Sequence, residues 1–261
     1  GWTVSGGGSI SGTTYTQGAG NCTLTAKWTA NAVNYTVRHW KMNLSGSGYT
    51  EDTASRQTLT ANADSTVTLA NLKKSFTGFT YKEGKVGNTV KTTATVLPDG
   101  SLVIDLYYTR NQYTVTVNKG TGISSVTGGG TYYYGASVTV NATVGTGYTW
   151  KNWTGSSSST NQQYTFTMGA ANVTLTANAT VNSYTLTVNP NGGSWNSTTS
   201  SSSLTLAYGS TKAIANPTRT GYAFAGWTVS GGGSISGTTY TQGAGNCTLT
   251  AKWTANAVNY T

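Results

Sequence analysis

The chain has 261 residues, of which 8% are charged and 34 are glycine, and its formal net charge is +9. Ordinary domains carry roughly 25% charged residues, so this surface depends on hydroxyls and amides, and its scattered cations do not form the stripe that binds a nucleic acid backbone. One histidine, six carboxylates and two cysteines are too few for a metal centre or a catalytic triad. The composition therefore predicts neither an enzyme nor a cofactor-binding protein.

The first 36 residues recur without change at residues 226–261. The copies start at positions 1 and 226, so the period is 225 residues. Identity over this length is expected of a tandem array, and we expect both ends of the chain to be cut points within a longer array whose export signal lies elsewhere. Cys22 and Cys247 are the same site in two copies, for which we predict a buried thiol, with a disulfide between copies or chains as the alternative.

Similar strand-opening phrases divide the period into three units. They begin at Tyr35, Tyr113 and Tyr184, and each continues with a threonine and an aliphatic residue. The predicted units are residues 35–112, 113–183 and 184–259, preceded by residues 1–34 as the second part of an earlier unit and followed by residues 260–261 as the start of the next.

Residues 1–32 lack an opening strand. We therefore expect them to have no complete core of their own, and to be completed by preceding residues of the same chain or by a neighbouring copy's residues equivalent to 184–225.

Apolar residues at every second position predict β-strands along most of the chain. In chain order the clearest runs are residues 102–107, 137–144, 164–168, 184–188 and 249–253. Residues 65–76 fit either a short helix or a strand followed by a turn. Glycine- and proline-rich turns are expected between the strands at residues 6–8, 98–100, 128–130, 190–193 and 231–233. The predicted fold class is all-β, as a tandem string of small domains.

The aromatic residues have two predicted roles. Alternation places the tryptophans in domain cores, at positions 2, 28, 150, 153, 227 and 253. By contrast, Tyr132, Tyr133 and Tyr134 follow one another, so at least one ring must lie on the outer face of a strand. We predict that Tyr133 forms an exposed patch or, preferably, a contact between domains or chains.

The third unit closely resembles the internalin-type B repeat, or Listeria-Bacteroides repeat. The resemblance rests on Tyr184–Gly193, Ala207–Gly209, Asn216–Trp227 and Leu249–Trp253. It implies a small β-grasp-like domain that occurs in strings on bacterial surface proteins, without catalytic residues.

The other two units show weaker resemblances. The second unit looks like a divergent B repeat, through Thr146–Trp153 and Val173–Ala177. The first unit is similar to mucin-binding-protein-like repeats, through Tyr35–Lys41, Phe76–Tyr81 and Asp99–Tyr108.

A spontaneous amide bond between lysine and asparagine is one chemical possibility in a surface fibre, and it needs a buried acid nearby. In the first unit Lys41 and Asn111 follow the opening and closing strands, and Asp105 or Glu83 is the candidate acid. The alternative, that all are ordinary surface residues, is preferred. His39 is predicted to be a strand histidine, and Asp99 a turn former.

These observations favour a structural repeat of a bacterial extracellular surface fibre or stalk, in which short connectors make the array a semi-rigid rod and uncovered strand edges allow self-association into a filament. The predicted partners are copies of the same chain, with glycans or anionic cell-wall polymers as further possibilities. The alternative is an adhesin module that binds host glycans or mucin, and a third reading is an accessory segment of a polysaccharide-degrading enzyme. No apolar run reaches the ~18 residues of a membrane span.

Overall fold

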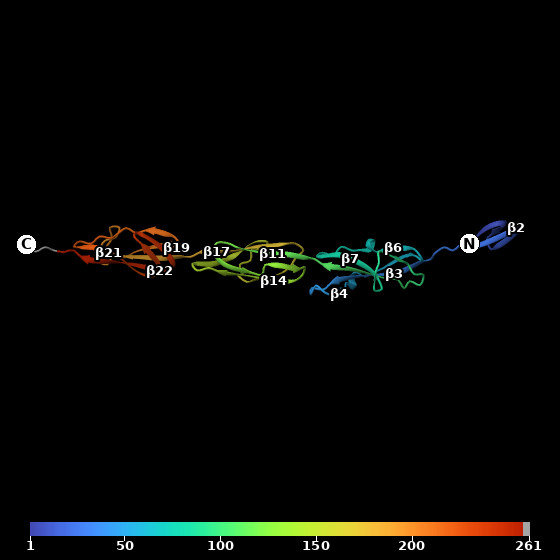
Figure 1. Cartoon of the computed structure of the whole chain (residues 1–261), viewed down its shortest axis with the longest axis horizontal. Helices are drawn as coiled ribbons and strands as arrows, with labels where there is room; N and C mark the ends of the chain where they lie inside the picture. Colours follow the sequence, from blue (N-terminus) through green and yellow to red (C-terminus); the bar gives the residue numbers. More distant parts are fainter. Residues whose placement is uncertain (258–261) are drawn as a thin grey trace, which may run out of the picture. The chain divides into compact units, whose positions relative to one another are not determined.

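The structure is a computed structural model that describes residues 1–257. Within this range the regular structure is 22 strands and two short 3₁₀ helices, which confirms the all-β prediction and its organisation as several small β units (Figure 1). The chain divides into two compact units, residues 1–111 and residue 112 onward. Residues 260–261, assigned to the next period, lie outside the described range.

Residues 1–31 form one long hairpin, whose strands are β1 (Trp2–Ser11) and β2 (Thr14–Ala26). They make a two-stranded antiparallel sheet. None of these residues is buried, because a single hairpin has no second layer to cover its apolar face.

Residues 32–111 form a six-stranded sheet and a separate two-stranded pair, β6-β9. Five strands of the sheet follow the order β4-β3-β10-β7-β8, and the sixth, β5, pairs with the N-terminal part of β3. The elements are β3 (Ala32–Met42), β4 (Tyr49–Glu51), η1 (Thr53–Ser55), β5 (Gln57–Asn62), β6 (Thr66–Thr68), η2 (Leu69–Leu72), β7 (Phe79–Val86), β8 (Thr89–Val90), β9 (Thr93–Thr95) and β10 (Val103–Arg110). Val37, Leu69 and Ile104 are fully buried in the core.

Residues 112–182 form two facing sheets, in the orders β13-β11-β17-β15 and β12-β14-β16. The strands are β11 (Gln112–Lys119), β12 (Ile123–Thr127), β13 (Gly130–Tyr133), β14 (Ser137–Val144), β15 (Tyr148–Gly155), β16 (Tyr164–Thr167) and β17 (Val173–Val181). Trp153, Val140 and Leu175 are fully buried between the sheets. Removing their apolar side chains from water stabilises the unit.

Residues 183–257 form a sheet in the order β19-β18-β22-β20, with β21 also paired to β22. The strands are β18 (Ser183–Asn189), β19 (Ser202–Ala207), β20 (Thr211–Ala213), β21 (Tyr222–Ser236) and β22 (Thr239–Ala255). Leu186, Ile214 and Tyr240 are fully buried in the core.

All three units share one pairing. The first strand of each lies parallel to its last strand, as β3 beside β10, β11 beside β17 and β18 beside β22. Parallel strands need a long crossover, which here consists of the remaining strands of the unit. The opening phrases at Tyr35, Tyr113 and Tyr184 therefore lie in the central strands of their sheets.

Several strand predictions are confirmed in detail. The run 137–144 is β14, in which Val138, Val140 and Ala142 are buried while the residues between them are exposed. Residues 65–76 contain the short strand β6 followed by the single 3₁₀ turn η2, so the strand-and-turn alternative is the right one.

The glycine triplets at residues 6–8 and 231–233 are not turns, which corrects that prediction. Both lie inside long strands, where the register shifts by three residues: Gly6 pairs with Cys22 but Gly8 with Gln17, and Gly231 and Gly233 show the same shift. Gly231 has φ +104°, and a Cβ there would overlap the carbonyl oxygen of Asn246. The triplets lie opposite enlarged β-bulges of the partner strands, at residues 18–21 and 243–246, and they need glycine because this neighbouring backbone approaches closely.

The prediction that the tryptophans are core residues holds only in part. Trp153 is fully buried, and Trp150, Trp227 and Trp253 are half-buried. Trp2 and Trp28 are exposed, because the hairpin that carries them is not covered by other strands.

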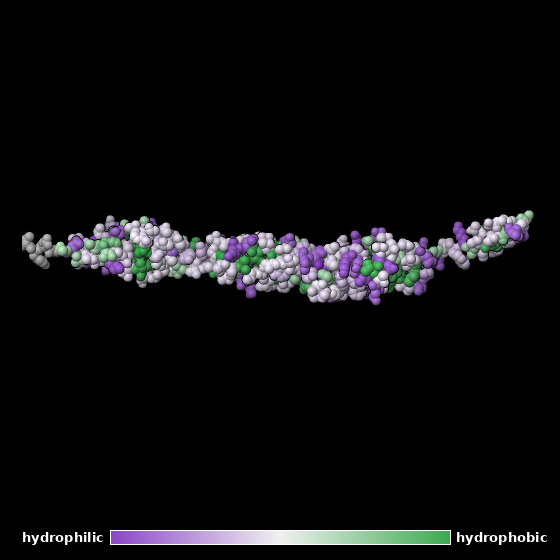
Figure 2. All heavy atoms as spheres, in the orientation of Figure 1, coloured by the Kyte–Doolittle hydropathy of each residue, from purple (hydrophilic) through white to green (hydrophobic). Residues whose placement is uncertain are grey.

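The surface has little charge. Figure 2 shows a face on which most residues have intermediate hydropathy, with strongly hydrophilic residues only in places. This agrees with a chain in which hydroxyl and amide side chains replace charged ones.

Candidate functional site

The junction between the second and third units is a single residue, Asn182, which separates β17 from β18. Its backbone N–H donates to the carbonyl of Gly147 at 2.9 Å, and its own carbonyl accepts from the N–H of Tyr208 at 2.8 Å. Gly147 belongs to the second unit and Tyr208 to the third. One connecting residue is therefore hydrogen bonded to both units, which restricts rotation about its backbone.

The side chain of Asn182 adds two further bonds. Its Oδ1 accepts from the hydroxyl of Thr149 at 2.6 Å, and its Nδ2 donates to the hydroxyl of Tyr184 at 3.4 Å. Thr149 and Tyr184 flank the junction on opposite sides in the sequence. Each such bond contributes about 1 kcal/mol, and together they hold the amide in one orientation.

Two tyrosine rings pack across the same junction. The rings of Tyr148 and Tyr208 lie edge to face with centroids 5.8 Å apart, a geometry worth about 0.5–1.5 kcal/mol beyond its buried area. Gly147 has φ +80°, and a Cβ there would overlap the Tyr208 ring. Glycine is needed at this position both for the backbone conformation and for the approach of the ring.

The same arrangement recurs at other unit ends. Asn111 donates its N–H to Gly78 and accepts from the Thr80 hydroxyl at 2.7 Å, and Asn256 donates its N–H to Gly221, both N–H bonds being 2.9 Å long. In each case the glycine has φ of 77–80° and stands between a threonine and an aromatic residue. We call this combination the asparagine clamp: a terminal asparagine bonded to a Thr-Gly-aromatic turn.

Sequence reasoning identified the short connectors but not the asparagine clamp. The Thr-Gly-aromatic turns and the asparagines that bind them are about 33–35 residues apart, from the differences 111 − 78, 182 − 147 and 256 − 221. Recurrence of this spacing was the available signal, but isolated glycines and asparagines are common in turns.

We expect the substitution Asn182→Ala to lower the free energy of unfolding of the second compact unit by about 1–2 kcal/mol, because two side-chain hydrogen bonds are lost. The matched control is Asn118→Ala, at an exposed strand position, which should change it by less than about 0.5 kcal/mol. Urea denaturation of the full chain, followed by tryptophan fluorescence, measures both. Equal effects of the two substitutions would contradict the clamp.

In the first compact unit, Asp105 points to the outer face of the sheet and is almost fully buried. Both of its oxygens accept from Arg38, at 2.6 and 2.8 Å, and Oδ1 also accepts from the Trp40 indole at 2.7 Å. The hydrogen bond to Asp105 raises the pKa of Arg38. A bidentate pair of this kind joins β3 to β10 directly.

The residues suggested for an amide cross-link are not assembled as predicted. The register pairs Asp105 with Arg38 and Tyr108 with Lys41, so strand alternation places Asp105 and Lys41 on opposite faces of the sheet.

The other members of the suggested set have contacts of their own. Lys41 Nζ binds Asp52 at 2.6 Å. Glu83 pairs with Tyr107 on the Asp105 face, and Asn111 lies in its asparagine clamp. Strand geometry thus separates the lysine from both suggested acids.

We therefore expect the intact mass of the chain to equal the mass calculated from its unmodified sequence, because no acid that was suggested for the reaction reaches Lys41. High-resolution mass spectrometry of the purified chain measures this. Loss of one ammonia from the native chain, absent from a Lys41→Arg variant, would contradict it.

His39 lies in β3, in agreement with the predicted strand position, and it is packed in the protein interior. Its side chain is fully buried, with Nδ1 3.0 Å from the Tyr108 hydroxyl and Nε2 3.1 Å from Gln57 Oε1. Burial lowers its pKa, and the positive charge of Lys74 acts in the same direction, whereas the Gln57 bond opposes it. The native imidazole is therefore neutral near pH 7.

The pKa of His39 is lower in the folded than in the unfolded chain, so on acidification the unfolded chain binds a proton at a higher pH than the folded chain does. The free energy of unfolding of the first compact unit should therefore fall as pH drops from about 7 to 5. The pKa values of Asp52 and Glu51 are lowered by Lys41 and Arg56, so their contribution is lost only below about pH 4. Urea denaturation across this range measures the slope, and His39→Gln should flatten it. An unchanged slope in the variant would assign the effect to other groups.

The predicted tyrosine contact lies at a sheet edge. Tyr132 and Tyr133 belong to β13, the outermost strand beside β11. Tyr132 packs against the core and donates its hydroxyl to Gly128 at 3.0 Å, while Tyr133 and Tyr134 are half-buried. A role of this edge in assembly stays a prediction.

Asp99 is the predicted turn former, since it accepts from the Ser101 N–H at 2.9 Å.

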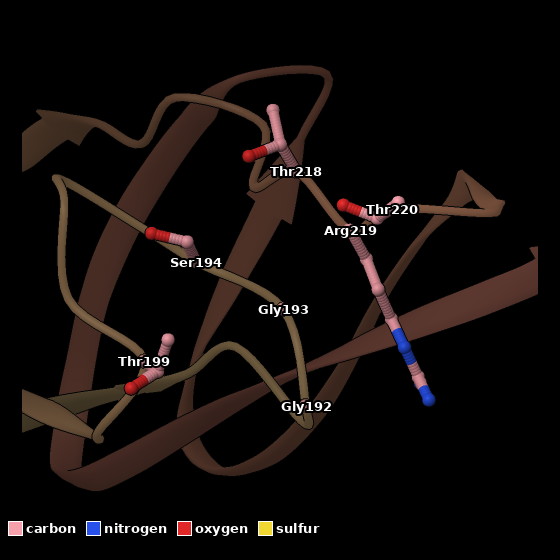
Figure 3. Close-up of a pocket in the computed structure, with 7 residues that line it drawn as sticks. All are labelled: Gly192, Gly193, Ser194, Thr199, Thr218, Arg219 and Thr220. Carbon is pink, nitrogen blue, oxygen red and sulfur yellow. The ribbon is translucent and has the colours of Figure 1, made fainter.

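A shallow cavity of about 420 Å³ lies in the third unit (Figure 3). Its lining is polar and contains no aromatic ring, and Figure 3 shows the Arg219 side chain extending from the Thr218–Thr220 segment away from Gly193. Arg219 stacks on Tyr222 at 3.9 Å. Sugar rings usually bind on aromatic faces, so this cavity does not favour glycan binding.

Neither a metal cluster nor a membrane helix occurs in the described part of the chain. Residues 1–257 contain no group of three or more His, Cys, Asp or Glu side chains placed to hold a metal ion. Within the same range no helix has the length and hydropathy to cross a membrane.

Both cysteines are free thiols. Cys247 is buried, as predicted, whereas Cys22 is only half-buried.

Comparison with known families covers the second and third units. Residues 113–183 match the divergent InlB B-repeat domain, and residues 184–252 match the Listeria-Bacteroides repeat domain. These two units are consecutive B-repeat domains. The likeness of residues 35–112 to mucin-binding repeats stays a prediction.

Two further comparisons add little about function. The Bacillus anthracis TIE protein is similar in structure to 89% of the chain, with 8% sequence identity and a TM-score of 0.41. The chain spans about half of that protein, 53% of its length. The search of curated proteins found no match. The B-repeat domains indicate a repeat of a bacterial surface protein, and no catalytic family is indicated.

Proposed function

We propose that the chain is a structural repeat of a bacterial extracellular fibre or stalk, and that its β units transmit tension. The observation that carries the proposal is the parallel pairing of the first and last strands in each unit. In such a pair the chain enters the sheet at one end and leaves at the other. Tension between the two points acts along the strands and shears all their hydrogen bonds together, instead of breaking them one at a time.

The asparagine clamp supports the same function. A connector of one residue, bonded on both sides, has little freedom to bend, so the B-repeat domains joined at Asn182 behave as a semi-rigid pair. Low charge and uncovered sheet edges such as β13 support side-by-side association of copies. Self-association into a filament is part of the proposal.

Force spectroscopy on the second unit tests the role of strand direction. With both native cysteines replaced by serine, handles at Gln112→Cys and Thr180→Cys pull on opposite ends of the β11–β17 pair, which is the shear geometry. Handles at Gln112→Cys and Ala171→Cys pull on neighbouring ends and peel the strands apart. All three sites are exposed.

We expect the shear geometry to need a severalfold higher unfolding force than the peeling geometry, because it breaks the ladder cooperatively. The peeling pair is the matched control, since the fold and one handle are the same. Equal forces in both directions would overturn the mechanical proposal.

A further inference from the structure

The core face of the parallel pair β3–β10 ends in positive charge. On β3 the buried His39 is followed two positions later by Lys41. On β10 the buried Tyr108 is followed two positions later by Arg110. Side chains at alternate positions of a strand share one face of the sheet, and the register places Tyr108 beside Lys41. Two cations therefore stand at the end of a face whose other residues build the core.

The segment that follows η2 brings two more cations to this end of the core. Phe76 packs edge to face on Tyr108, with ring centroids 4.9 Å apart. Lys74 is held at both its backbone and its tip, because its N–H donates to the Tyr108 hydroxyl and its Nζ to the carbonyl of Ser55, each at 3.0 Å. Lys73 beside it is exposed. Lys73 and Lys74 are the only two cationic residues that are adjacent in the sequence.

Aromatic rings and one carboxylate hold the other two cations. Lys41 Nζ lies 3.9 Å from the centre of the Phe76 ring and 2.6 Å from Asp52 Oδ2. Arg110 Cζ lies 4.6 Å from the centre of the Phe79 ring. We call Lys41, Lys73, Lys74 and Arg110 the cation cluster. Four cations and one carboxylate give the group a net charge of +3, which aromatic faces stabilise but do not neutralise.

A cavity of about 320 Å³ opens beside the cation cluster, and its lining includes Lys73, Lys74, Phe76 and Phe79. Sites for small molecules have volumes of ~300–1,000 Å³, so the cavity has room for a small anionic group. Like charges that are gathered in one place repel one another and destabilise the folded chain. An anion in the cavity relieves this repulsion.

The residue types favour phosphate over carboxylate. A lysine ammonium group binds phosphate as a point charge, whereas arginine typically holds a carboxylate through two parallel hydrogen bonds. Three members of the cation cluster are lysines, and the Nε of Arg110 already donates to the carbonyl of Met42 at 3.0 Å. The donors beside the cavity are therefore mainly ammonium groups.

Two features favour a linear phosphodiester polymer that is not a nucleic acid. Single-stranded nucleic acids stack their bases on open aromatic faces, but cations lie over the rings of Phe76 and Phe79. The sequence also lacks the stripe of cations that follows a duplex. Residues 112–257 carry cations and no carboxylate, so a long polyanion meets no repulsive side chain there. A flexible polyanion without bases agrees with both features.

We propose that Lys41, Lys73 and Lys74 bind a phosphate group of a linear polymer with phosphodiester links. The Phe76 ring and Asp52 hold Lys41 in position, and Lys73 is the exposed member of the group. Salt screens exposed charges, so binding should weaken as ionic strength rises. This binding function goes beyond the proposed mechanical role and does not depend on it.

His39 provides a probe of the site, because it is the only histidine in the chain. Burial, followed by the charges of Lys74 and Lys41, lowers its pKa, and a bound phosphate opposes the effect of these charges. Addition of synthetic poly(glycerol phosphate) to the full chain at pH 7 and low salt should therefore shift the NMR resonances of the imidazole in a saturable manner. Inorganic phosphate at the same phosphate concentration should bind more weakly, because only the polymer keeps further phosphate groups near the site.

The double variant Lys73→Gln, Lys74→Gln should weaken polymer binding by about tenfold or more at low salt, because two of the three ammonium groups are lost. The matched control, Lys82→Gln with Lys91→Gln, removes two exposed lysines of the same compact unit that do not line the cavity. It should weaken binding by less than about twofold. Lys73→Gln alone covers the case in which loss of the Lys74 contact unfolds the unit, and it should still weaken binding by about threefold.

Three outcomes would overturn the proposal. A shift that does not saturate, or an equal loss of binding in the double variant and its control, would show that no defined site exists. Inorganic phosphate that binds as tightly as the polymer would overturn the polymer as ligand. A single-stranded DNA of equal charge that binds more tightly would assign the cavity to nucleic acids. The force measurement on the second unit is unaffected by these results, so the two proposals fail separately.

Discussion

Parallel pairing of the first and last strands is the constraint on which each unit depends. It places the opening tyrosine phrase at the centre of the sheet, where residues such as Leu186 and Val37 are fully buried. It also requires all the intervening strands to act as the crossover. Both chain ends then leave from opposite ends of one strand pair. In the proposed function, tension therefore loads the same contacts that build the core.

The connectors determine how far this property extends beyond one unit. At Asn182 the junction has no loop, and hydrogen bonds run from one residue to Gly147 and Tyr208 on either side. Glycine conformation and asparagine hydrogen bonding are weak effects individually. The asparagine-to-glycine hydrogen bond recurs at Asn111 and Asn256, so the ends of all three units follow one rule although their cores differ in sequence.

The first compact unit differs in how its strands are held. It contains all six carboxylates of the chain, and the buried Asp105 joins its central strands through Arg38 and Trp40. The B-repeat domains use apolar packing and backbone pairing instead. A buried carboxylate such as Asp105 needs all of its hydrogen bonds, and these bonds fix one arrangement of the strands. They add to the limited stability that a small apolar core supplies.

The sequence by itself determined the strands, the period and the B-repeat resemblance, because alternation such as that of Val138, Val140 and Ala142 is local and needs no partner to be recognised. It did not reveal the bulges at the glycine triplets or the asparagine clamp, since both depend on backbone groups from distant segments. The clearest case is Leu24 and Leu249, which stand in identical sequences. One is exposed and the other fully buried, because burial depends on whether another strand covers the residue, and only the tertiary structure decides that.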